Sequence, residues 1–288
     1  MLREAAPAKI NLALHVTGRR ADGYHLLQSL VVFAEMADAV SVQPAPKDSL
    51  SISGPFAPSL GAGPNNLVMR ALSAFRDRWP DALPEGLAFH LVKNLPVASG
   101  IGGGSADAAA ALRLLRVMAR VPIAEQDLFA LAGTLGADLP MCLCAQALVA
   151  GGIGEELRPL PAFPSVHLVL VNPMQALSTP EVFRGLTSRE NLGLPALPDP
   201  MTRPAQLGLW LAETRNDLEA PAIALMPLIG EMIARIRSIS GCMLARMSGS
   251  GATVFGLFGS GAQAHQAAHE LRAQWPGFWV AAAPVIVP

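Results

Sequence analysis

Residues 96–111 read PVASGIGGGSADAAAA and combine a glycine-rich turn with an alanine-rich run. Glycines fill four of the five positions from 100 to 104, so the backbone can turn sharply, approach a ligand closely and point several N–H groups at it. The alanine-rich run from Ser105 to Ala119, stopped by Pro122, predicts a helix directly after the turn. Because the start of a helix attracts anions, the pattern predicts a phosphate-binding turn. On glycine count alone, a tight turn capped by Ser105 remains the alternative.

This turn differs from the two commonest phosphate motifs. No Gly-Lys-Ser/Thr follows the glycines, which excludes a Walker loop, and Ser105 stands where the dinucleotide-binding pattern has its third glycine. A second cluster, SGSGA at residues 248–252, lies between two predicted strands. Its serines and N–H groups could face the same ligand, and the alternative is a flexible hairpin.

Hydrophobic periodicity on both sides of the turn predicts strands mixed with helices. The expected strands cover residues 9–16, 30–42, 87–92, 166–171, 243–247, 253–258 and 278–283. One expected helix begins near residues 64–66, and the others cover residues 105–119, 128–135, 203–213, 219–239 and 262–275. Strict βαβ alternation is absent, so an α+β fold is favoured. Prolines and glycines between residues 151 and 164 predict a boundary between two domains, 1–155 and 156–288.

Composition excludes several classes of protein. With 288 residues, 51% of them apolar and 15% charged, the chain has the composition of a globular protein rather than a disordered or coiled-coil one. A formal charge of -1 argues against a nucleic-acid partner. The longest uncharged stretch, residues 159–180, contains five prolines and predicts no membrane span. The first residues form no signal peptide, so a cytoplasmic location is expected.

Cysteines and histidines offer little chemistry. Cys142, Cys144 and Cys242 lack metal-ligand spacing and are expected to be buried thiols. The six histidines are scattered singly, which supports neither a zinc site nor a hydrolase triad.

Three polar residues in apolar surroundings are candidates for a reaction centre. Lys9 and Asn11 share one face of the first predicted strand. Asp138 follows a predicted helix in the segment GADLP, residues 136–140, next to an uncharged apolar stretch. A solvated lysine and a helix-capping or turn aspartate are the alternatives for these positions.

The order of these motifs carries a family resemblance. Residues 96–109, GADLP at 136–140 and RMSGSGA at 246–252, together with AKINL at 8–12 and RADGYH at 20–25, resemble the GHMP kinase superfamily over nearly the whole chain. The front motifs and GADLP resemble the members that phosphorylate the 2-hydroxyl of 4-diphosphocytidyl-2-C-methyl-D-erythritol, in the non-mevalonate route to isoprenoids. The resemblance implies an N-terminal domain like the second domain of ribosomal protein S5, a C-terminal ferredoxin-like domain and a cleft between them.

The resemblance also implies roles for individual residues. Asp138 would take the proton from the hydroxyl or orient it, and Lys9 would keep Asp138 ionised and stabilise charge on the transferring group. ATP and Mg²⁺ would be the cofactors. The substrate-binding positions are Asn11, Tyr24, His25, Thr179 and Phe183, with Tyr24 and Phe183 suited to stacking on cytosine. The ATP-binding positions are Asn66, Lys93, Pro96, Val97, Ala98, Ser99, Gly100, Ile101, Gly102, Gly103, Gly104, Ser105, Ala106, Ser248 and Gly249.

The glycine turn departs from the usual family pattern. Ala98 and Ser99 stand where glycines are usual, and Ala106-Asp107 stands where Ser-Asn often follows. Ser105 is therefore the remaining hydroxyl of the pair to reach phosphate or Mg²⁺. Asp107 in the first helical turn would repel phosphates unless it points away or meets the metal.

Two other functions compete with this one. Another kinase of the superfamily, acting on homoserine or mevalonate, would share the glycine turn but not the surroundings of Tyr24, His25 and Thr179. A nucleotide-binding protein without kinase activity would not need Lys9 and Asp138.

Overall fold

A computed structural model describes residues 1–97 and 99–287 of the chain. They form two compact units. The first unit consists of residues 1–8, 36–97 and 102–145, and the described part of the second consists of residues 9–35, 99–101 and 146–287. Each unit therefore consists of three separate segments of the chain. The predicted domains, 1–155 and 156–288, divide the chain at one point, and this division stays a prediction. Two long strands, β1 (Leu2–Arg19) and β2 (His25–Ala45), contribute residues to both units.

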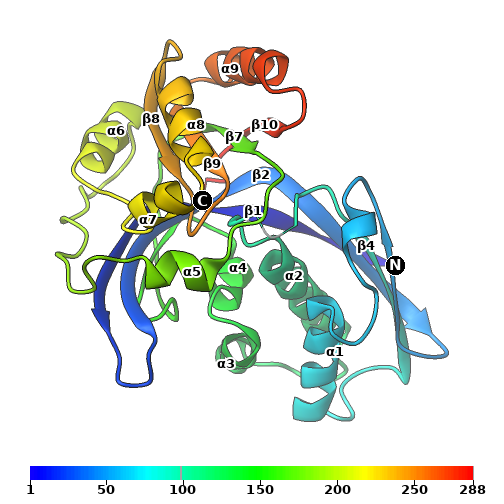
Figure 1. Ribbon diagram of the computed structural model, residues 1–288. Coiled ribbons are helices and arrows are strands. Elements are labelled where there is room, and N and C mark those ends of the chain that lie inside the picture. Colours follow the sequence, from blue (N-terminus) through cyan, green and yellow to red (C-terminus); the bar gives the residue numbers. More distant parts are fainter. Residues whose placement is uncertain (98, 288) are drawn as a thin grey trace. The chain divides into compact units, whose positions relative to one another are not determined.

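The first unit combines helices with a small sheet. Strand β4 (Gly86–Val92) pairs antiparallel with the C-terminal half of β2 and parallel with β3 (Ser49–Ser53), which is followed by the short helix η1 (Ala57–Ser59). The helices are α1 (Leu67–Arg78), α2 (Gly103–Met118), α3 (Glu125–Leu135) and α4 (Leu139–Cys144), and Figure 1 shows them close together. Helix α2 packs on α1 and α4. Its alanines at positions 106 and 108–111 are at most 1% exposed, and their small side chains let neighbouring elements approach its axis.

The second unit contains a four-stranded antiparallel sheet in the order β10-β7-β9-β8. The strands are β7 (His167–Asn172), β8 (Cys242–Met247), β9 (Val254–Phe258) and β10 (Trp279–Pro284). Helix α8 (Leu228–Arg237) is the last of the helices between β7 and β8, and α9 (Gly261–Gln274) lies between β9 and β10. This β-α-β-β-α-β order is that of a ferredoxin-like domain, as expected.

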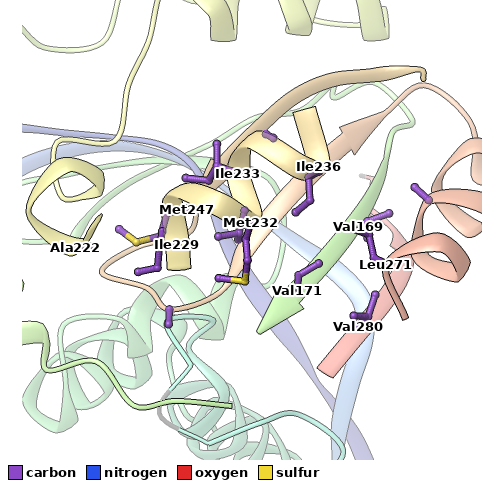
Figure 2. Close-up of a cluster of buried hydrophobic side chains, with 14 of the residues drawn as sticks. Val169, Val171, Ala222, Ile229, Met232, Ile233, Ile236, Met247, Leu271 and Val280 are labelled. Atoms are coloured by element: carbon purple, nitrogen blue, oxygen red, sulfur yellow. The ribbon is translucent and has the colours of Figure 1, made fainter. Parts of the chain in front are cut away.

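One hydrophobic cluster holds the two helices on this sheet. Figure 2 shows Ile229, Met232 and Ile236 of α8 facing side chains of β7 and β8, with Leu271 and Val280 beside them. The apolar residues of α8 recur at positions 229, 232, 233 and 236, which is the spacing of one helix face. Burial of this face on the sheet stabilises the unit.

The second unit also contains two further short strands and three further helices among the described residues. Strand β5 (Leu148–Gly151) pairs with the N-terminal half of β2 and with β6 (Glu156–Pro159), all antiparallel. The remaining helices are α5 (Thr179–Arg184), α6 (Pro204–Ala212) and α7 (Glu219–Leu225). Within residues 1–97 and 99–287, every helix is too short or too polar to span a bilayer.

Two sequence expectations need correction. The helix predicted over residues 219–239 is two helices, α7 and α8, because Pro227 disfavours helical backbone at Met226, whose ψ is 86°. Of the three cysteines, Cys142 is buried as expected, whereas Cys144 and Cys242 are partly exposed. The expected α+β mixture is confirmed, and most predicted elements lie within three residues of the observed ones.

Candidate active site

The glycine turn ends where helix α2 begins. Gly100 and Gly102 have φ angles of 75° and 66°, in the left-handed region that favours glycine. The N–H of Ala106 donates to the carbonyl of Gly102 at 2.8 Å, which closes the first turn of α2. The N–H groups of residues 103–105 precede this bond and have no partner within the helix. The turn therefore presents three backbone donors at the positive end of the helix dipole, which is the arrangement that binds phosphate.

The predicted ATP-binding residues of the glycine turn differ in their exposure to solvent. Gly104 is exposed, whereas Gly102, Gly103 and Ser105 are partly exposed. Pro96, Ser99, Ile101 and Ala106 are buried, so the side chains of Ile101 and Ala106 serve packing. Val97 is 37% exposed, and Ala98 lies outside the described residues.

Lys93 lies beneath the first turn of α2. It is 2% exposed, and its ammonium Nζ donates to Oδ2 of Asp38 and, at 2.7 Å, to Oδ2 of Asp107. Asp107 therefore faces the interior of the first unit. Its carboxyl has a pKa raised to about 7, mainly by burial and partly by Asp38, with Lys93 opposing the shift. The repulsion of phosphate considered for Asp107 is thus weakened by an adjacent cation.

The second glycine cluster forms the turn between β8 and β9 and supports the first. The hydroxyl of Ser248 is fully buried, donates to the carbonyl of Gly100 at 3.3 Å and accepts the N–H of Asn11 at 3.2 Å. Thr253 donates from its hydroxyl and its N–H to the carbonyl of Ser99, at 2.6 and 3.2 Å. Because the Ser248 hydroxyl already has both partners, the second turn positions the first one through hydrogen bonds.

Residues that the sequence analysis did not single out hold this second turn. The Asn216 amide donates to the carbonyls of Met247 and Gly249 at 2.9 and 2.8 Å. Thr253 in turn accepts a hydrogen bond from Asn172 at 2.9 Å. Asn216 and Asn172 lack a sequence motif, and only their burial at 6% and 3% exposure marks them.

Strand β1 places Lys9 and Asn11 inside the second unit. Both are buried, at 4% and 3% exposure, so a solvated lysine is excluded. The N–H of Lys9 donates to the carbonyl of Ile101 at 2.9 Å, which joins β1 to the glycine turn. The Asn11 amide donates to the hydroxyl of Ser29 at 2.8 Å, and its Oδ1 is buried without a hydrogen-bond partner in the described part of the chain.

The predicted substrate residues lie in two places in the second unit. His25 and Phe183 stack, with ring centroids 4.9 Å apart and planes 29° apart. Burial, followed by Arg19 and Arg189, lowers the pKa of His25, so its ring is neutral at pH 7. Thr179 shares a 2.7 Å hydrogen bond with Ser250 of the second glycine turn. Tyr24 is 58% exposed.

Asp138 and Asn66 lie at the starts of helices in the first unit. Asp138 is partly exposed and precedes α4, and its carboxylate does not cap that helix. Arg113 of α2 donates to the carbonyls of Cys142 and Leu143 at the other end of α4, at 3.0 and 3.4 Å. Asn66 caps α1 by accepting the N–H of Val68 at 3.0 Å, and its contact with a nucleotide stays a prediction.

A magnesium ion would find few protein ligands near the glycine turn. Residues 1–97 and 99–287 contain no group of three or more histidine, cysteine, aspartate or glutamate side chains placed to hold a metal. Asp107 faces Lys93, so the partly exposed hydroxyl of Ser105 is the side-chain group that the start of α2 offers to a metal ion. This fits Mg²⁺, which keeps several waters and binds mainly substrate phosphates.

Comparison with known proteins places the chain in a family. Residues 66–146 match the model of the GHMP kinases N terminal domain, and residues 196–277 match the model of the GHMP kinases C terminal domain. The 4-diphosphocytidyl-2-C-methyl-D-erythritol kinase of Paracoccus denitrificans is 54% identical over 97% of this chain and 95% of its own. The enzyme of that name from Agrobacterium fabrum is 52% identical over 96% of this chain and 93% of its own.

Solved structures agree with this assignment. A crystal structure of 4-(cytidine 5'-diphospho)-2C-methyl-D-erythritol kinase is 36% identical, covers 99% of both chains and superposes with a TM-score of 0.81. A homoserine kinase from Cytophaga hutchinsonii shares the fold, with a TM-score of 0.67 at 15% identity. The chain is a small-molecule kinase of the GHMP superfamily and belongs, within it, to the family of 4-diphosphocytidyl-2-C-methyl-D-erythritol kinases.

Proposed function

We propose that this chain transfers the γ-phosphoryl group of ATP to the 2-hydroxyl of 4-diphosphocytidyl-2-C-methyl-D-erythritol, with Asp138 and Lys9 as the catalytic residues. The observation that carries the proposal is the start of α2, where two left-handed glycines precede three backbone donors. The names of relatives up to 54% identical over nearly the whole chain supply the substrate. The proposal includes the cytoplasmic location expected from the sequence, and no nucleic-acid or membrane partner.

Phosphoryl transfer requires positioning and charge stabilisation more than covalent chemistry. The N–H groups of residues 103–105 hold the phosphates of ATP, and the second glycine turn keeps the first one in shape through Ser248 and Thr253. Mg²⁺, when bound at the phosphates with Ser105 as its protein ligand, supplies positive charge. Lys9 supplies a further cation for the charge on the transferring group.

The acceptor hydroxyl needs a partner for its proton. Asp138 accepts that proton or orients the hydroxyl toward the phosphorus, which is the role of a general base. The stacked pair of His25 and Phe183 offers an aromatic surface for the cytosine ring. The Nε2 atom of His25 is buried without a hydrogen-bond partner in the described part of the chain and suits a polar edge of the base.

An assay of ADP release tests the proposal. The purified protein is incubated with Mg-ATP and, in separate reactions, with 4-diphosphocytidyl-2-C-methyl-D-erythritol, homoserine or mevalonate. We expect ADP release above background with the cytidyl substrate alone. Release with homoserine or mevalonate and not with the cytidyl substrate would contradict the proposal, and binding of ATP without turnover would indicate a nucleotide-binding protein.

A further inference from the structure

The buried cluster of Lys93, Asp38 and Asp107 joins three elements of the first unit. Asp38 belongs to β2, Lys93 follows β4, and Asp107 lies in the first turns of α2. All three side chains are at most 4% exposed. Ion pairs this deeply buried are costly to form, and removal of one partner leaves an uncompensated charge.

Lys93 is fixed at both its backbone and its side chain. Its N–H donates to the carbonyl of Ser53 at 2.7 Å, and its carbonyl accepts the N–H of Phe56 at 3.2 Å. Its ammonium is shared between the two carboxylates. Lys93 is therefore a fixed point to which the start of α2 is attached through Asp107.

The ammonium of Lys93 lies directly under the phosphate-binding end of α2. A Cβ atom built on Gly103, the first residue of the helix, would come within 3.1 Å of Nζ and within 3.9 Å of Oδ2 of Asp38. The cation and the three backbone donors of residues 103–105 are thus at the same helix end. Because two carboxylates surround it, this ammonium adds no net positive charge to the helix end, and its effect on an anion comes through the position of the turn.

The two carboxylates differ in how fully they are satisfied. Oδ1 of Asp38 accepts the N–H groups of Asn94 and Leu95 at 2.6 and 2.8 Å, and its Oδ2 accepts from Lys93. Oδ1 of Asp107 is buried with no hydrogen-bond partner in the described part of the chain. Asp107 is therefore held in the cluster by Lys93, and this bond is one of those that fix the first turn of α2.

We propose that Lys93 and Asp107 are positioning residues for ATP, which hold the first turn of α2 in its phosphate-binding form, and that the Lys93 ammonium acts through this turn without contact with the nucleotide. This inference rests on the proposed function and assigns Lys93 a role different from the direct ATP contact that the resemblance implies. It follows that the affinity for ATP depends more on a side-chain oxygen at position 107 that accepts from Lys93 than on the negative charge of that side chain.

Two substitutions at one position separate these effects. Asp107→Asn keeps an oxygen that accepts from Lys93 but removes the charge, whereas Asp107→Leu removes the acceptor. Titration calorimetry with Mg-ATP should show a Kd within about 3-fold of the wild-type value for Asp107→Asn and at least about 10-fold higher for Asp107→Leu, as loss of one hydrogen bond to a charged group predicts. Lys93→Met should resemble Asp107→Leu.

A matched control excludes a general loss of stability. Arg76 of α1 forms an ion pair with Asp48 in the same unit, with bonds of 2.9 and 2.8 Å, and this pair is more exposed than the Lys93 cluster. Arg76→Met should lower the melting temperature and leave the Kd for Mg-ATP unchanged. Hydrogen exchange at the N–H of Ala106, which closes the first turn of α2, should be faster in Asp107→Leu than in Arg76→Met.

The binding measurement also separates this inference from the proposed function. Equal Mg-ATP affinity in wild type, Asp107→Asn and folded Asp107→Leu would overturn the inference, even if the cytidyl substrate is phosphorylated. Binding of Mg-ATP without phosphorylation of that substrate would contradict the proposed function. The Kd values of the Asp107 variants would still test the inference. If Lys93→Met does not fold, the two Asp107 variants carry the test.

Discussion

Gly100 and Gly251 meet backbone to backbone, so closely that a Cβ atom on Gly100 would overlap the carbonyl oxygen of Gly251. The contact joins the two glycine turns within the second unit, where Ser248 and Thr253 also bond to the first turn. Both glycines have positive φ angles, 75° and 86°. Gly100 thus leaves the space that the backbone of Gly251 fills, whereas a Cβ atom on Gly251 would meet Met247 and Leu177.

This contact predicts that Gly100→Ala is damaging. The left-handed backbone alone costs about 1 to 2 kcal/mol for a residue with a side chain, and displacement of Gly251 adds to it. We expect a free energy of unfolding at least about 2 kcal/mol lower, with a higher KM for ATP. Gly133→Ala in α3 is the control, since a Cβ there meets nothing within 4 Å. Denaturant unfolding should show equal or greater stability for that variant.

Asp138→Ala tests the proposed base. Removal of a general base lowers kcat by about 10² to 10⁴, so we expect a loss of at least about 10² with little change in ATP affinity. Steady-state kinetics with both substrates, together with calorimetry for ATP, measures the two quantities. Turnover near the wild-type value would remove Asp138 from the chemistry.

Arg113 should matter because it holds the helix that follows Asp138. It bonds the last carbonyls of α4 at 3.0 and 3.4 Å, and a small displacement of a catalytic group can cost up to about 10² in rate. We expect Arg113→Met to lower kcat about 10-fold, but less than 2-fold when Asp138→Ala is already present, because residues that act as a unit are not additive. Arg116→Met, an exposed arginine on the same helix, is the control. Equal effects of Arg113→Met in both backgrounds would mean that it does not act through Asp138.

His15 predicts a pH dependence of stability. Its Nδ1–H donates to the carbonyl of Leu192 and its Nε2 accepts the N–H of Arg215, at 3.1 and 3.0 Å, so the folded state needs the neutral ring. Burial, followed by Arg215, lowers its pKa, with Asp217 opposing the shift. A lowered pKa gives stability that is present above pH 6.5 and is lost as the pH falls toward the folded-state value.

Denaturant unfolding of wild type and His15→Gln from pH 8 to pH 5 measures this effect. The difference between their free energies of unfolding should be constant above about pH 7. Below pH 6.5 the wild type should lose stability relative to His15→Gln, by at most about 1.4 kcal/mol per pH unit. A difference that stays constant down to pH 5 would show that the ring does not remain neutral in the folded state.

Most of the local conformations could be predicted from the amino-acid sequence. The glycine turn with its helix, the alternating strands and the four-residue spacing in α1 are set by backbone freedom and hydrophobic period, which depend on neighbouring residues. The motifs also placed the chain in its family, because their order along the chain is a property of sequence. Helix α4 and the short strands β3, β5 and β6 were missed, since segments of four to six residues carry too little periodic signal.

Only the tertiary structure decided which groups the buried polar atoms meet. Asp107 faces Lys93 and, beyond it, Asp38, which is 69 positions earlier in the chain, and Ser248 bonds to Gly100 across 148 positions. Such partners are chosen by packing, because a polar atom removed from water must find a hydrogen bond wherever the fold brings one. The spacing of residues along a chain does not contain that information.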